Sequence, residues 1–155
     1  MEEINLGFND LETLPGEFGR LQSLEILWLE DNKFENFPQC LCEIIGLRSL
    51  RLQGNSIGVL PESLSNLQSL ETFDLSNNEI SEFPVVLARM KTLKSLWLRQ
   101  NQLSEIHINP EWPCLETFSV SSNMLYEENL SLLSEELLKC KNLKNIHMNG
   151  QRTIQ

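Results

Sequence analysis

The sequence is short of positive charge, and it has no long apolar run. Its 12 Lys and Arg residues face 22 Asp and Glu residues, which gives a net charge of −10. Nucleic acids and anionic membranes are polyanions, so neither is expected as a partner. No stretch approaches the roughly 18 apolar residues of a membrane span. The start Met1-Glu2-Glu3 is acidic where a secretory signal is basic, and no apolar run follows it. These absences favour a cytoplasmic protein.

Residues that commonly carry catalysis or bind metals are also scarce. The only histidines are His107 and His147, and neither is expected to have a serine or cysteine beside it. Cys40-Leu41-Cys42 lacks the two-residue gap of a zinc knuckle and has no second half. The seven glycines are scattered and form no phosphate-binding loop. We therefore expect no catalysis, no metal and no cofactor.

One short unit is repeated along the whole chain. Each unit has leucine-like residues at the spacing L-x-x-L-x-L-x-x-N, and the units start near residues 1, 24, 47, 70, 93, 115 and 143. The period is 23 residues for most of the chain and then changes to 22 and 28. The amide residues that end the motif are Asn9, Asn32, Asn55, Asn78, Asn101, Asn123 and Gln151.

This signature resembles that of the leucine-rich repeat family. Four units continue as L-P-x-x-L, which is similar to the subfamily that includes intracellular Ras-pathway scaffolds. These continuations start at Leu14-Pro15, Phe37-Pro38, Leu60-Pro61 and Phe83-Pro84. The resemblance implies a single domain over residues 1–155. Its fold would be a right-handed α/β solenoid with a parallel sheet on the concave face and mostly short turns on the convex face.

The same architecture follows from the physics of the motif. The last two leucines of each unit are two residues apart, so in a strand they point to one face while the residue between them points to the other. Stacking such strands at about 4.8 Å buries the apolar face continuously. The Asn amide both donates and accepts hydrogen bonds, so it is suited to pair the buried backbone groups of the turn.

Two units depart from the regular convex segment. In the fifth unit His107 takes the proline position, and two prolines at Pro110 and Pro113 exclude a helix. Trp112 is expected to fold inward and replace the missing leucines. In the sixth unit residues 129–140 have apolar residues in steps of three and four, which predicts one helix near the C-terminus.

Neither end of the repeat array has a polar cap, which solenoids need. We therefore expect the chain to be uncapped at both ends. The chain would then be a segment of a larger structure, or its ends would associate with another copy. Secreted members of the family that the sequence resembles usually have cysteine clusters at both ends, and this chain has none. Free thiols are favoured, and a Cys114–Cys140 bond is left open.

The residue after the first leucine of each unit alternates in sign. In neighbouring strands such residues are lateral neighbours, so alternation replaces repulsion with attraction. We interpret this column as a self-neutralising ladder rather than a binding site. It consists of Glu25, Arg48, Glu71, Lys94, Glu116 and Lys144.

The residue between the two inward leucines forms the column that we interpret as a binding surface. It reads Asn5, Trp28, Arg51, Asp74, Trp97, Ser119 and His147. Trp28 and Trp97 are expected to face solvent roughly 14 Å apart, and Trp and Arg are the types most enriched at interface hot spots. The competing interpretation is that Trp28 only covers its neighbours, stacked under Arg51. Flanking positions add Ile26, Glu30, Asp31 and Arg99. Glu30 and Asp31 are expected to be balanced by Arg51.

Three functions are thus weighed. The first is a non-catalytic scaffold or adaptor that binds an unidentified protein partner on the concave sheet, with intracellular signalling implied by the resemblance. The second is a repeat segment of a larger protein, or a regulatory subunit of an enzyme such as a phosphatase. The third, an enzyme, is disfavoured because no titratable groups are expected to converge on a pocket.

Overall fold

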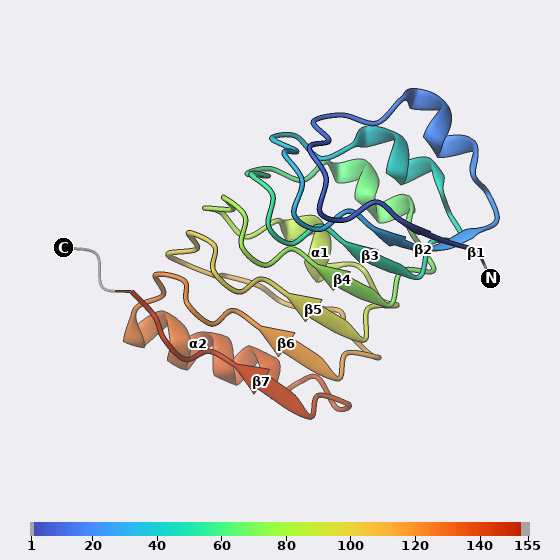
Figure 1. The fold of residues 1–155 in the computed structure, drawn as a ribbon. Helices are drawn as coiled ribbons and strands as arrows, with labels where there is room; N and C mark the ends of the chain where they lie inside the picture. The colour runs from blue at the N-terminus through green and yellow to red at the C-terminus, as the bar shows by residue number, and fades with distance from the viewer. Residues whose placement is uncertain (1, 153–155) are drawn as a thin grey trace.

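Seven parallel strands form one sheet in chain order. The computed structural model describes residues 2–152, so Met1, where the first unit begins, lies outside the described residues. Figure 1 shows the strands side by side from β1 to β7, with the connecting segments folding back behind them. The expected solenoid with a parallel sheet is confirmed. The strands are β1 (Glu2–Asn5), β2 (Leu24–Trp28), β3 (Ser49–Arg51), β4 (Thr72–Asp74), β5 (Ser95–Trp97), β6 (Thr117–Ser119) and β7 (Asn145–His147).

The connecting segments contain more helix than expected. Four of them start directly after the proline of the L-P-x-x-L motif, which is the N-cap in each case: its backbone is extended, and its carbonyl accepts the first hydrogen bond of the helical segment. Three are 3-10 helices and the fourth is one α-helical turn, where simple turns were expected. These segments are η1 (Gly16–Arg20), η2 (Gln39–Glu43), η3 (Glu62–Asn66) and α1 (Val85–Ala88).

The predicted C-terminal helix is present as α2 (Glu127–Leu137), shifted by a few residues from the expected range 129–140. Its buried face includes Leu133 and Leu137, as the spacing predicted. Asn129 is fully buried and hydrogen-bonds both the N–H and the carbonyl of Ile106. This pair of bonds fastens α2 to the preceding repeat. It also removes Asn129, which begins the tripeptide Asn129-Leu130-Ser131, from the surface that glycosylation requires.

The fifth repeat compensates for its irregular segment as expected. Trp112 is only 2% exposed and packs against Phe83 and Phe118, with ring centroids 6.5 and 5.5 Å away. Its Nε1–H donates to the carbonyl oxygen of Leu87 at 2.7 Å. The indole therefore packs in the core, and its one polar atom is paired.

The asparagines form a continuous ladder through the core. Asn55 is typical: its Oδ1 accepts from Phe34 N in the preceding repeat, and its Nδ2 donates to the carbonyls of Leu29 and Leu52, all at 3.0 Å. The same bonds recur at each later repeat. In the last one the longer Gln151 side chain replaces Asn and accepts from Leu125 N. Each amide thus satisfies backbone groups of two consecutive repeats.

A left-handed residue precedes each Asn and turns the chain out of the strand. Gly54 in this position has φ of +72°, and a Cβ there would lie 2.3 Å from Oδ1 of Asp31. Most other repeats accept a side chain in this position at the cost of backbone strain. The positive-φ residues are Phe8, Asp31, Gly54, Asn77, Gln100, Ser122 and Gly150.

The alternating charges at the strand entrances form most of the expected ladder. Glu71 is its centre: it accepts from Arg48 at 2.7 Å and from Lys94 at 2.8 Å. Arg48 reaches Glu25 more loosely at 3.9 Å, and Lys144 pairs with Glu116 at 2.9 Å. Among the described residues no ion pair joins Lys94 to Glu116, so the ladder is interrupted between β5 and β6.

Replacing Asn55 by Leu is expected to lower the free energy of unfolding by about 3 kcal/mol or more, because each backbone group left unpaired in the core costs about 1–3 kcal/mol. Urea unfolding at neutral pH measures the change. Asn9 is the matched control, since it holds the same motif position but is exposed, and its amide bonds only the carbonyls of Leu6 and Gly7. Equal losses from Asn55→Leu and Asn9→Leu would contradict the ladder.

Replacing Glu71 by Gln is expected to lower stability near neutral pH by about 0–1 kcal/mol, since exposed pairs contribute little. Hydrogen bonds from Lys94 and then Arg48 hold the pKa of Glu71 below its ordinary value. The contribution is therefore present above the pKa of the unfolded chain and is lost as pH falls through the folded pKa. Urea unfolding at neutral and acidic pH should show the difference between variant and parent disappearing in acid. Glu25→Gln, with its single loose contact, should change stability less.

Candidate functional site

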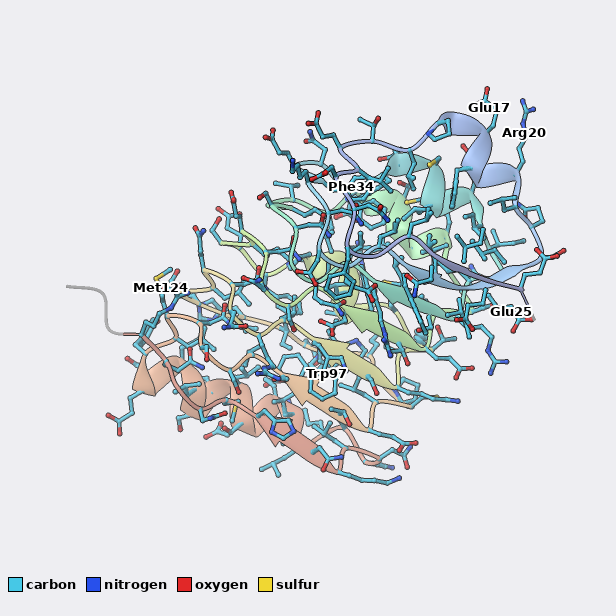
Figure 2. The ribbon with its side chains drawn as sticks, viewed as in Figure 1. Glu17, Arg20, Glu25, Phe34, Trp97 and Met124 are labelled. Atoms are coloured by element: carbon cyan, nitrogen blue, oxygen red, sulfur yellow. The ribbon has the colours of Figure 1, made fainter. Side chains whose placement is uncertain are left out.

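The strand register places the predicted binding column in one line across the concave face. Trp28 pairs with Arg51, Arg51 with Asp74, and Asp74 with Trp97 on successive strands. The alternation of side chains along each strand turns this column away from the leucine core, and both tryptophans are half-buried. In Figure 2 the labelled Trp97 ring lies over the sheet, away from the convex segments.

Arg51 leans toward the N-terminal end of the sheet and covers Trp28. Its guanidinium carbon lies 4.9 Å from the centroid of the Trp28 ring, within the range of a cation–π contact. The contact that the sequence offered as a competing interpretation is therefore present. It does not bury the pair, because Arg51 is exposed and Trp28 remains half-exposed.

Trp97 leans the other way and stacks on His147. The two ring centroids are 6.1 Å apart with an interplanar angle of 18°. Ser119, which lies between them in the column, is fully buried. Sequence reasoning missed this role of His147. The signal was present, since His147 occupies the same column two strands further on.

Asp74 lies between the Arg51–Trp28 pair and the Trp97–His147 pair. Its Oδ1 accepts from the backbone N–H of Ser76 at 2.9 Å. Although Arg51 is its neighbour in the register, no ion pair joins them. The column therefore holds the cation–π pair Arg51–Trp28 and the stacked pair Trp97–His147, with a carboxylate between them.

The flanking residues of the predicted site have different surroundings. Ile26 is half-buried beside Trp28, and Asp31 and Arg99 are exposed. Glu30 is buried at 7% exposure, because its side chain folds over Gly7, where a Cβ would lie 2.8 Å from the Glu30 carboxyl carbon. The site is thus open around Trp97 and Arg99 and closed around Glu30.

The expectation that Arg51 balances Glu30 and Asp31 is wrong. The guanidinium lies over the Trp28 ring and forms no ion pair with either carboxylate. One oxygen of Glu30, Oε2, is buried without a hydrogen-bond partner. The Arg51 guanidinium contacts the Trp28 ring instead of forming the ion pair with Glu30 or Asp31 that the charges predicted.

No group of three or more His, Cys, Asp and Glu residues in residues 2–152 is placed to hold a metal ion. The register does put Ser119 beside His147, contrary to expectation, but Ser119 Oγ is buried and makes no hydrogen bond. A nucleophile and base need such a bond and access to substrate.

The cysteines are free thiols, so the Cys114–Cys140 bond is absent. Burial raises the pKa of the Cys40, Cys42 and Cys140 thiols, which disfavours the reactive thiolate. Cys114 is exposed.

None of the helices in residues 2–152 has the length and apolar character needed to cross a bilayer.

Comparisons with known proteins agree with this geometry. Residues 45–103 match the family model described as leucine rich repeat. A leucine-rich repeat protein from Leptospira interrogans has 31% identity and a TM-score of 0.85 over 94% of this chain. The chain is a leucine-rich repeat protein. No curated protein matches it at a significant level.

Other leucine-rich repeat structures share the fold. An internalin from Listeria monocytogenes has 23% identity and a TM-score of 0.78 over 99% of the chain. The ectodomain of the receptor kinase GASSHO1/SCHENGEN3 from Arabidopsis thaliana, solved in complex with CASPARIAN STRIP INTEGRITY FACTOR 2, has 25% identity and a TM-score of 0.73 over 96%. The chain spans 36%, 43% and 21% of the lengths of the Leptospira, Listeria and Arabidopsis chains.

Acrylamide quenching of single-tryptophan variants tests the orientation of the column in this leucine-rich repeat protein. In each variant two of the three tryptophans are replaced by Phe. We expect Trp28 and Trp97 to be quenched severalfold more strongly than Trp112, which serves as the buried control at 2% exposure. Quenching of Trp97 as weak as that of Trp112 in the folded protein would mean that the column is not accessible.

Proposed function

We propose that this leucine-rich repeat protein is a non-catalytic adaptor or scaffold that binds a protein partner on its concave sheet. The observation that carries the proposal is the pair of half-exposed indoles, Trp28 and Trp97, held on one column with Arg51 and Asp74 between them. Leucine-rich repeat domains typically act as protein interaction modules.

The energetics of the column support docking. Burying a tryptophan removes a large apolar area from water, and buried Trp and Arg anchors dominate interface energies. The cation–π contact and the indole–imidazole stack already hold both rings in position. Less side-chain entropy is then lost on binding, which favours affinity.

The proposal places the protein in the cytoplasm. Four free thiols support a reducing compartment such as the cytoplasm, and the net charge of −10 favours a protein partner over nucleic acid or an anionic membrane. Signalling is supported only by the L-P-x-x-L resemblance. Self-association through the edge strands β1 and β7, and a role as one segment or regulatory subunit of a larger assembly, stay predictions.

Affinity capture from a cell lysate tests the surface when parent and variants are compared. A partner captured by the parent should bind Trp97→Ala and Arg51→Ala more weakly by more than about 1 kcal/mol, or roughly fivefold in Kd, because these are central anchors. Val59→Ala is the control, since Val59 is 80% exposed and lies outside the strands. All variants should remain folded, because the concave contacts that they lose contribute only about 1 kcal/mol to folding.

A captured partner that binds Trp97→Ala and Arg51→Ala as tightly as Val59→Ala would contradict a concave docking surface. Weaker binding by all three variants would indicate a general effect of truncation instead of a site.

A further inference from the structure

The proposed concave docking surface also indicates the chemistry of its partner. Resting on that proposed function, we infer that the surface takes a basic side chain, arginine or lysine, from an extended segment of the partner protein. This side chain would lie against the Asp74 carboxylate and the free face of the Trp97 indole.

Asp74 has the unfilled hydrogen-bonding capacity that such a ligand requires. Its Oδ1 accepts from Ser76 N, and among residues 2–152 no hydrogen bond or ion pair occupies Oδ2. The nearest cation in the register, Arg51, directs its guanidinium to Trp28 over β2, two strands from β4. That separation is roughly 10 Å, about one Debye length in physiological salt. Arg51 therefore forms no ion pair with Asp74, and Asp74 Oδ2 stays available to a second cation.

Trp97 supplies the second contact. His147 stacks on one face of the indole, from the C-terminal side of the sheet. On the other side of Trp97, the register places Asp74 of β4 next to it. A cation held by the carboxylate is then within reach of the negative face of the ring, which is the geometry of a cation–π contact.

The strand positions before this column leave room for an extended chain. In β3 to β6 these positions carry only small hydroxyl residues, so no bulky side chain covers the sheet at these positions. They are Ser49, Thr72, Ser95 and Thr117. A partner backbone along this track would place one long side chain beside Asp74.

The carboxylate also discriminates between partners. An apolar segment docked across the column would cover Asp74 without a counter-charge, and burying an unpaired ion is costly. A basic side chain removes that cost and forms a charge-assisted hydrogen bond. The net charge of −10 attracts a basic partner at longer range.

Two short peptides separate this inference from simple charge attraction. Both are acetylated and amidated heptapeptides of serine and threonine, with a central arginine in one and its neutral isostere citrulline in the other. Titrations are followed by proton–nitrogen chemical shifts of the Trp97 indole N–H and the Ser76 backbone N–H. We expect saturable shifts in both signals, with a Kd for the arginine peptide about tenfold lower than for the citrulline peptide.

Asp74→Asn should remove that preference while keeping the fold, because an Asn Oδ1 can still accept from Ser76 N. Glu79→Gln is the matched control: it also removes one negative charge, but from an exposed residue outside the strands, and should retain the preference. Equal affinity for both peptides, a preference that survives Asp74→Asn, or no saturable shift would overturn the inference. The proposed function fails separately, if Trp97→Ala and Arg51→Ala leave partner capture unchanged.

Discussion

The structure depends on one constraint, which is that every repeat must satisfy the backbone groups of the repeat before it. A strand of three to five residues cannot bury its leucines alone, and the turn that follows it carries N–H and carbonyl groups that no strand pairs. Stacking of the repeats buries the leucines, and the Asn side chain pairs the turn groups, because its amide joins consecutive turns across the core. Spacing between rows is therefore set by hydrogen bonds inside the solenoid and does not depend on the concave side chains.

This constraint explains why so much of the fold was predictable from sequence. Each repeat contacts mainly its neighbours, so a fixed period specifies the architecture without long-range information. The motif located the strands, and the inward position of Trp112 followed from the leucines missing around it. The details of the convex side were not predictable in the same way. The same proline position starts a 3-10 helix at η3 and an α-helical turn at α1, so the motif does not specify which of the two forms.

The candidate site was predictable as a column but not as a set of contacts. Register assigns Trp28, Arg51, Asp74 and Trp97 to neighbouring strands. It does not decide whether Arg51 turns to the carboxylate on one side or the indole on the other. The burial of Glu30 depends on the absence of a side chain at Gly7, which holds the same position one repeat earlier. Register places the two residues side by side, but it does not decide that the Glu30 side chain folds over the glycine.

Stability and recognition are therefore carried by different residues of the same short repeat. Core leucines and the Asn ladder hold the rows in place, whereas the concave column contributes only contacts of about 1 kcal/mol to folding. A side chain in that column can change with little loss of stability, because its backbone position is fixed from inside. Any partner consequently meets a rigid arrangement in which Arg51 and His147 have already oriented the two indoles. The carboxylate between them accepts from Ser76 N with one oxygen and keeps the other free.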